Sequence, residues 1–265
     1  MRLADRKPWR AAAWQAVVAV ACVYTPVTAT IVCEGTYRSH LQGMATDKQG
    51  ALYWSFTRDL VKTDMTGKVL KHITVRSHHG DPAYCDGRLY VAVNFGRFNE
   101  APGKADSWVY VYDAKDLSLV SKHAVPELVH GAGGMAYHAG RFIIVGGLPK
   151  GYQENYLYEY DTKLKFVKRH VLKSGYTLLG IQTASYADGA WWFGCYGGEL
   201  LKADASFRLV GKYKFDGSYG IVELPDDRYI VGRCFDKARR GKALFARPDP
   251  KKGMRILTTT TAGRR

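Results

Sequence analysis

The sequence predicts an all-β protein built from five copies of one four-stranded unit. Three observations support this prediction. A pattern of two successive hairpins recurs about every 45 residues. Within each copy, apolar and polar residues alternate as they do along half-buried strands. Beyond residue 29, no segment shows the apolar period of an amphipathic helix. Units of this size, repeated in phase, are typical of a β-propeller, here with five blades of four antiparallel strands.

The outer hairpin of each unit is marked by an aspartate at its turn. Successive aspartates are separated by 49, 48, 43 and 45 residues. Aspartate suits such a turn because its carboxylate accepts hydrogen bonds from nearby backbone amides. Each one lies between two alternating segments, which we expect to be the third and fourth strands of a blade. The five turn residues are Asp64, Asp113, Asp161, Asp204 and Asp249.

An inner hairpin precedes each of these outer hairpins. Its copies read GMATDKQGALYWSF, DPAYCDGRLYVAVN, GMAYHAGRFIIVGG, TASYADGAWWFGCY and IVELPDDRYIVGRC. The Asp-Gly pairs at 86–87 and 188–189 favour tight hairpin turns. We therefore expect the innermost strands of the five blades to begin near Gln42, Asp81, Gly134, Gln182 and Gly220.

The ring of blades must be closed, because an unclosed stack of sheets would leave unpaired strand edges. The sequence allows two ways of closing it. In the first, residues 30–37 supply a strand to the fifth blade. In the second, residues 254–259 form its outer strand, and the turn residue Asp249 favours this version.

The N-terminus has the order of a secretory signal peptide. Residues 1–10 carry four basic side chains and one acid, residues 11–23 are mostly apolar, and Val27-Thr28-Ala29 offers small residues for cleavage. We expect a signal peptide at residues 1–29 and one propeller domain at 30–265. The mature protein would then be secreted or periplasmic, with no stable membrane span after cleavage. An uncleaved N-terminal anchor is the alternative.

Charge and cysteine content limit which partners and which kinds of cysteine site are expected. The formal net charge is +15, but no nucleic-acid-binding motif accompanies it, so we do not expect DNA or RNA as a partner. Four cysteines follow the leader, and their spacing matches neither a zinc site nor a thioredoxin-like motif. Their disulfide state is left open by the sequence. These residues are Cys33, Cys85, Cys195 and Cys234.

Polar residues gather in the short segments that precede the innermost strands. These segments read SHLQGM, SHHGDP, VHGAGGM, LGIQTA and SYGIVE, and four of the eight histidines fall in three of them. In a propeller these segments share one face, so their side chains are predicted to converge. The predicted set is His40, Gln42, His78, His79, Asp81, His130, Gln182 and Tyr219.

Imidazole groups bind metals and carry protons near neutral pH. The catalytic candidates are therefore His40, His78, His130 and Asp81, with Asp81 orienting an imidazole. A divalent metal ion is a candidate cofactor, with His40, His79 and His130 as its ligands. Because His78 and His79 are adjacent on an extended strand, only one of them is expected to face the channel. The alternative is a ring of polar residues bridged by water.

Substrate-binding candidates come from the same face. The amides of Gln42 and Gln182 can orient a carbonyl or amide group. Tyr219 lies just before the innermost strand of the fifth blade. Two long loops, at 94–107 and 146–156, are expected to roof the pocket. Within them, Arg97 and Lys150 would attract an anionic ligand.

The segment HLQGMATDKQGALYWSFTRDLVKTDMTGKVL resembles the first blade of the five-bladed glutaminyl cyclotransferases. The matching features are a Gln-Gly pair, a Tyr-x-Ser strand and a D-x-T-G-K-V turn, that is, Gln42, Gly43, Tyr53, Ser55, Asp64, Gly67 and Lys68. The other blades resemble the broader superfamily of exported bacterial propellers, which includes NHL-repeat and gluconolactonase-like proteins. The resemblance implies an exported five-bladed propeller.

The function predicted from these residues is binding of a small polar or anionic molecule on the His/Gln-rich face. Acid–base or metal-assisted chemistry on that molecule would make the protein an enzyme, and the sequence leaves this open. Two alternatives remain. One is a non-catalytic scaffold for a protein or glycan partner, and the other is a glutaminyl cyclotransferase-like enzyme.

Overall fold

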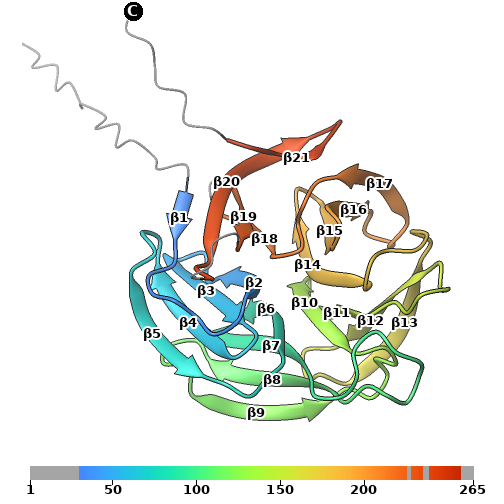
Figure 1. The fold of residues 1–265 in the computed structure, drawn as a ribbon, viewed down its shortest axis with the longest axis horizontal. Coiled ribbons are helices and arrows are strands. Elements are labelled where there is room, and N and C mark those ends of the chain that lie inside the picture. The colour runs from blue at the N-terminus through green and yellow to red at the C-terminus, as the bar shows by residue number, and fades with distance from the viewer. Residues whose placement is uncertain (1–29, 226–227, 235–238, 258–265) are drawn as a thin grey trace, which may run out of the picture.

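The computed structural model describes residues 30–225, 228–234 and 239–257. Five antiparallel sheets stand in a ring around a central channel (Figure 1). This confirms the predicted five-bladed β-propeller. The described residues include no helix long and apolar enough to span a membrane. The predicted signal peptide at 1–29 lies outside the described residues.

The first four blades each contain four consecutive strands, ordered from the channel outward. Blade one consists of β2 (Leu41–Thr46), β3 (Ala51–Phe56), β4 (Asp59–Asp64) and β5 (Val69–Thr74). Blade two consists of β6 (His79–Cys85), β7 (Arg88–Asn94), β8 (Ser107–Asp113) and β9 (Leu119–Ala124). Blade three consists of β10 (Ala132–His138), β11 (Arg141–Gly146), β12 (Asn155–Tyr160) and β13 (Phe166–Leu172). Blade four consists of β14 (Ile181–Ala187), β15 (Ala190–Cys195), β16 (Glu199–Ala203) and β17 (Leu209–Lys214).

Blade five is closed by both ends of the described chain. Its inner strands are β18 (Ile221–Glu223), β19 (Tyr229–Arg233) and β20 (Lys242–Asp249). β1 (Thr30–Val32) pairs with one half of β20, and β21 (Gly253–Ile256) pairs with the other half. The two closures expected as alternatives are therefore used together, because β20 is eight residues long and each short strand covers only part of its edge.

Each pair of neighbouring blades encloses its own apolar cluster. Between blades five and one, for example, Trp54 and Phe56 pack with Ile230 and Phe245. Full burial of one such side chain stabilises the fold by about 1.5–3 kcal/mol. Because the cluster around Trp54 joins blade five to blade one, the ring is closed by side-chain packing as well as by strand pairing. Among the described residues, no disulfide joins the four cysteines Cys33, Cys85, Cys195 and Cys234.

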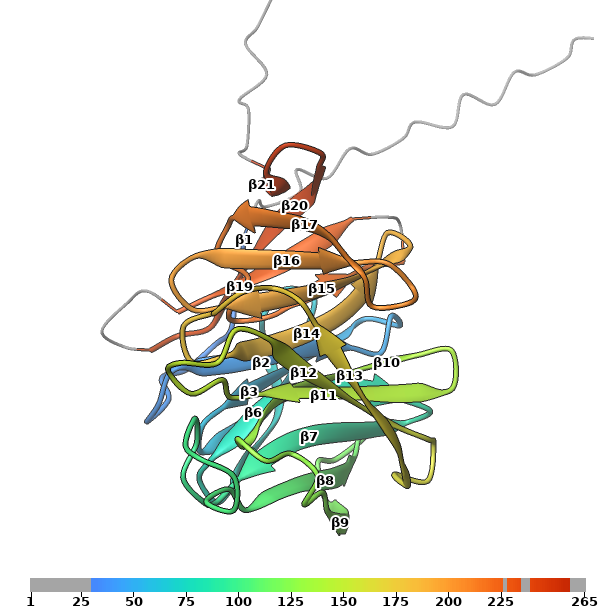
Figure 2. The ribbon, with the colours of Figure 1, turned by 90° about the vertical axis from the view of Figure 1, so that its right-hand side faces the viewer.

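All innermost strands run in the same direction through the channel, so the ring has two distinct faces. We call the face where these strands begin the upper face, and the face where they end the lower face. The two long loops, between β7 and β8 and between β11 and β12, emerge together on the upper face, at the left in Figure 2. This placement agrees with their expected position.

Asp81 fills the middle of the channel. Its Oδ1 accepts a hydrogen bond from the Met44 N–H of blade one at 3.2 Å, and its Oδ2 accepts one from the Ala184 N–H of blade four at 3.1 Å. Glycines of two neighbouring strands leave room for it. A Cβ atom on Gly43 would overlap the Asp81 carboxyl, and one on Gly134 would lie 2.8 Å from Asp81 Cβ. The carboxyl group thus links three blades at the channel axis.

The Gly43→Ala variant tests this close approach. The added methyl group meets the carboxyl and lies 2.6 Å from Asp81 Cα, so backbone must move. We expect a loss of about 1–3 kcal/mol in the free energy of unfolding, measured by urea denaturation. Gly211→Ala is the matched control, because only the far end of the Tyr213 side chain stands in its way. Equal stability of wild type and Gly43→Ala would contradict the packing described.

Candidate functional site

A pocket of about 240 Å³ opens on the upper face of the channel. It is lined by the beginnings of innermost strands and by residues of the connecting loops. The lining residues are His40, Gln42, His78, Asn94, Gly96, Phe98, Gly133, Leu179, Gln182 and Tyr196. Three of the predicted polar residues from blade one and blade two therefore meet here, together with Gln182 of blade four.

A β-bulge lies at the start of the innermost strand in four blades. In blade one the pairing register shifts between Leu41 and Gly43, so that Gln42 is the extra residue. The same shift occurs around Gly133 in blade three and around Gln182 in blade four, and blade two has a shift between His79 and Pro82. Bulges commonly redirect a side chain next to a functional site. Here the bulged residues Gln42, Gly133 and Gln182 all line the upper pocket.

Gln42 is the buried centre of the polar contacts. Its Nε2 lies 2.8 Å from His40 Nε2, 3.0 Å from Thr57 Oγ1 and 3.3 Å from His78 Nε2. An amide nitrogen carries two protons, so it donates two of these three hydrogen bonds at a time. Each imidazole that accepts one must be unprotonated at Nε2. The contacts therefore favour neutral His40 and His78.

The electrostatic surroundings act in the same direction. Enclosure by the protein lowers the pKa of His40 below its usual 6.5, and the nearby Arg239 guanidinium lowers it further. Enclosure also lowers the pKa of His78, and the neighbouring His40 adds to this effect. Both rings keep an exposed surface at the pocket mouth. They are thus neutral bases near pH 7 that solvent or a ligand can reach.

His79 lies outside the pocket. It is fully buried, its Nδ1 donates to the Arg76 carbonyl at 2.7 Å, and its Nε2 accepts from the Tyr112 hydroxyl at 2.7 Å. Burial lowers the pKa of His79 to about 4. Because both ring nitrogens are engaged within the protein, His79 has no nitrogen left for a metal. Of the adjacent pair, His78 is the residue at the pocket.

His130 anchors the long loops. It is 3% exposed, and its Nδ1 donates to the Glu100 carbonyl at 2.8 Å. Its own carbonyl accepts a hydrogen bond from the Asn99 N–H at 2.9 Å. The ring also packs edge-on against Tyr152 of the second loop, with 4.9 Å between ring centroids. His130 therefore positions the loops and does not line the pocket.

The three predicted metal ligands are consequently not brought together. His40 lies at the pocket, His79 between strands of blade two, and His130 beneath the loops. Within residues 30–225, 228–234 and 239–257, no group of three or more His, Cys, Asp or Glu side chains is placed to hold a metal ion. The expected convergence of the three rings does not occur, because His79 is turned towards Arg76 and Tyr112 and His130 is held by the first long loop.

Asp81 lies below the pocket and does not line it. It is 1% exposed, and burial raises its pKa well above the usual 3.8, although the hydrogen bonds from Ala184 and Met44 oppose this shift. Asp81 contacts neither His40 nor His78 through a hydrogen bond in the described residues. Its position supports the channel and not the orientation of an imidazole.

The predicted binding residues divide into two groups. Gln182 lines the pocket, and its Nε2 donates to the Leu179 carbonyl at 2.7 Å. Tyr219 packs edge-on against His40, with 6.5 Å between ring centroids. In contrast, Arg97 and Lys150 are exposed and do not line the pocket. The conformations of their loops, which periodicity does not encode, direct both cations to solvent.

Three further lining residues were not predicted as site residues. Phe98 belongs to the first long loop, Leu179 precedes β14, and Tyr196 follows β15. Burial raises the pKa of Tyr196 to about 12, so its hydroxyl stays protonated. A signal for Tyr196 was present in the sequence, because it occupies the upper end of a second strand, the position that Asn94 occupies in blade two.

Solved structures of other proteins are similar to this chain to different degrees. The glutaminyl cyclase of Myxococcus xanthus superposes with a TM-score of 0.61 at 14% identity, covering 86% of this chain and 95% of that chain. The RRP9 WD40 repeats give 0.48 at 9% identity over 81% and 82%. The Neurospora crassa Pan2 WD40 domain gives 0.45 at 10% identity over 73% and 56%. At 14% identity, the first likeness shows the propeller fold alone. No protein-family model and no curated protein matches the sequence.

The buried His79 predicts a pH-dependent stability. Its pKa is lower in the folded state, about 4, than in the unfolded chain, 6.5, so the unfolded chain takes up the proton first. Stability is therefore lost as the pH falls from 6.5 towards 4, by up to about 3 kcal/mol.

The measurement is urea denaturation of wild type, His79→Gln and His123→Gln at several pH values in this range. His79→Gln should flatten the pH dependence because glutamine does not titrate there. His123, on the outer strand β9, is the matched control and should leave it unchanged. The same slope in wild type and His79→Gln would contradict this assignment.

Proposed function

We propose that the upper pocket binds a small polar molecule and that His40 and His78 transfer protons to and from it. One observation carries the proposal: two neutral, solvent-reachable imidazoles stand within 3.3 Å of the buried Gln42 amide. A general base works best when its pKa is below or near the working pH. Both histidines meet that condition.

The two imidazoles form a pair suited to holding one proton. A positive charge on His40 lowers the pKa of His78, so the doubly charged state is disfavoured. One ring can then accept a proton from a bound nucleophile while the other returns a proton to a leaving group. When Gln42 donates to Thr57 and to one imidazole, the Nε2 atom of the other imidazole is left free to accept a proton.

The remaining lining residues indicate which kind of ligand would fit the pocket. Gln182 uses its amide nitrogen on Leu179, and in the described part of the chain its Oε1 accepts no hydrogen bond. This oxygen is therefore suited to accept from an amine, amide or hydroxyl of a ligand. Phe98 and Leu179 supply an apolar wall. The volume of about 240 Å³ limits the bound part to a few functional groups.

A second candidate is cyclisation of an N-terminal glutamine, favoured by the fold shared with the Myxococcus xanthus glutaminyl cyclase and by the Gln42-Gly43 pair. In that reaction the α-amine attacks the side-chain carboxamide carbon, a C–N bond forms, and ammonia leaves. The amine loses a proton and the departing ammonia gains one. In this candidate function, the proposed role of His40 and His78 is to carry that proton.

The test uses the dipeptide Gln-Ala with wild type, His40→Ala, His78→Ala and the control His123→Ala. Binding is followed by the NMR signals of histidine-labelled protein, and turnover by ammonia release. We expect binding to shift the His40 and His78 signals. If ammonia is released, His40→Ala and His78→Ala should each lower the rate by about 10²-fold or more. The rate of the wild type should fall at acid pH, with a midpoint below pH 6.5.

The outcomes separate the candidates. Binding without ammonia release would remove glutamine cyclisation and keep the small-molecule site, to be tested with other amides. Equal rates in wild type and His40→Ala would contradict the proton-transfer role. No shift of either imidazole with Gln-Ala, glutamine or acetamide would contradict the binding proposal and favour the non-catalytic scaffold for a protein or glycan.

A further inference from the structure

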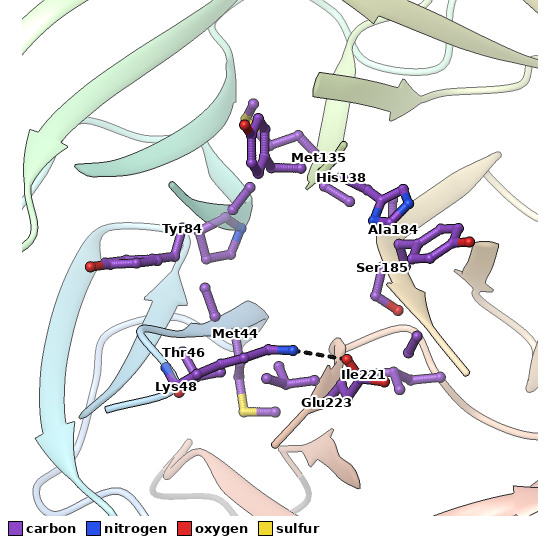
Figure 3. Close-up of a pocket in the computed structure, with 18 of the residues that line it drawn as sticks. Met44, Thr46, Lys48, Tyr84, Met135, His138, Ala184, Ser185, Ile221 and Glu223 are labelled. Carbon is purple, nitrogen blue, oxygen red and sulfur yellow. Dashed lines mark hydrogen bonds and ion pairs between the residues drawn. The ribbon is translucent and has the colours of Figure 1, made fainter. Parts of the chain in front are cut away.

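A second pocket, of about 300 Å³, opens on the lower face of the same channel. Asp81 and the glycines around it separate it from the upper pocket. Its floor takes one apolar residue from the same position of each innermost strand, namely Met44, Pro82, Met135, Ala184 and Ile221. Figure 3 shows Met44, Met135, Ala184 and Ile221 around one opening. None of these residues belongs to the upper pocket, so the lower pocket is a separate site.

Aromatic rings surround the mouth of the lower pocket. Tyr84, Tyr137 and Tyr186 occupy corresponding positions in blades two, three and four, and all three are half-buried. His138 stacks on Tyr186, with 3.4 Å between ring centroids and 13° between ring planes. Aromatic groups prefer stacked or edge-on ring partners, and methionine sulfur also contacts rings favourably. The walls and floor together therefore suit an inserted ring.

One hydroxyl in the pocket wall has no partner. Ser185 lines the pocket, and its buried Oγ makes no hydrogen bond within the described residues (Figure 3). The corresponding residues of the other blades are Ala45, Ala83, Ala136 and Val222. A buried hydroxyl without a partner lowers stability, and alanine would avoid that loss. A ligand with one polar group would satisfy Ser185, whose unbonded side chain is free to change rotamer.

Charged groups at the mouth already pair with each other. Lys48 Nζ lies 2.8 Å from Glu223 Oε2 across one side of the opening (Figure 3). Glu223 Oε1 also accepts hydrogen bonds from the Asp188 N–H at 3.2 Å and the Tyr229 hydroxyl at 3.3 Å. Burial and the nearby Arg141 lower the pKa of His138, and Glu223 opposes this, so its ring is neutral at pH 7. No unpaired charge in the described residues faces the pocket interior.

We propose that the lower pocket binds an uncharged aromatic ring with one hydrogen-bonding substituent, of the phenol or indole class. The ring would lie on the methionine-containing floor between the tyrosines, with its substituent bonded to Ser185. A sugar ring fits less well, because it carries a hydroxyl on nearly every carbon and burial leaves each in need of a partner. Among the described lining side chains, Ser185, His138 and the Tyr186 hydroxyl are the polar groups without a hydrogen bond to the protein, too few for the hydroxyls of a sugar.

The test measures binding of p-cresol and indole to the whole protein by saturation-transfer NMR and titration. We expect a Kd on the order of 1 mM, as for a fragment of about eight heavy atoms. Methyl glucoside and benzoate are the comparison probes for hydroxyl-rich and charged rings. N-acetyltyrosinamide distinguishes a free ring from a protein side chain as the source, because its backbone must fit past the mouth.

Ser185→Ala should weaken p-cresol binding about tenfold, the value of one hydrogen bond, and Ser185→Thr should retain it. Ser185→Ala is expected to fold, because three other blades lining the pocket carry alanine at this position, namely Ala45, Ala83 and Ala136. Gln182→Ala, in the upper pocket, is the control and should leave p-cresol binding unchanged. Absence of binding by both aromatic probes, tighter binding of methyl glucoside or benzoate, or unchanged binding by Ser185→Ala would overturn the proposal.

Discussion

The arrangement of the channel depends on how the carboxyl group of Asp81 is held. It comes from blade two, accepts backbone hydrogen bonds from blades one and four, and occupies space left by glycines of blades one and three. A buried carboxyl in this position links blades that are distant in sequence, since Asp81 and Ala184 are 103 residues apart. Asp81 lies buried between two pockets that share no lining residue.

The two pockets differ because their residues come from different levels of the same strands. Above Asp81, β-bulges turn Gln42 and Gln182 into a space shared with His40 and His78. Below it, the strands resume regular pairing, and the corresponding positions carry methionine, proline, alanine and tyrosine. The upper pocket is therefore the one that contains the two pocket histidines and glutamines, and the lower pocket the one with a methionine-containing floor and three tyrosines. The propeller repeat supplies one scaffold with two pockets of different composition.

Most of the fold could be predicted because each blade repeats the same physical requirements. The turn aspartates, Asp-Gly hairpins and strand alternation gave five blades whose first strands begin within about two residues of the expected positions. The sharing of β20 by β1 and β21 could not be predicted, because it depends on strand length and edge pairing between the two ends of the chain.

The site was predicted only in part, for reasons that are local. His40, Gln42, His78 and Gln182 converge as expected, since they precede or begin innermost strands. The orientation of His79 was not predictable from alternation alone, because the pairing register shifts between His79 and Pro82. Arg97, Lys150 and His130 depend on loop conformation. That Asp81 is buried below the pocket, and not at its surface, follows from Gly43 and Gly134, whose missing side chains make room for it.

The most direct test of this account is the titration of Asp81, followed by ¹³C NMR of its carboxyl carbon in aspartate-labelled protein and assigned by its loss in Asp81→Asn. We predict a midpoint well above pH 3.8, because the group is buried between the two pockets. A midpoint at or below 3.8 would contradict it, since burial would then not outweigh the hydrogen bonds from Met44 and Ala184.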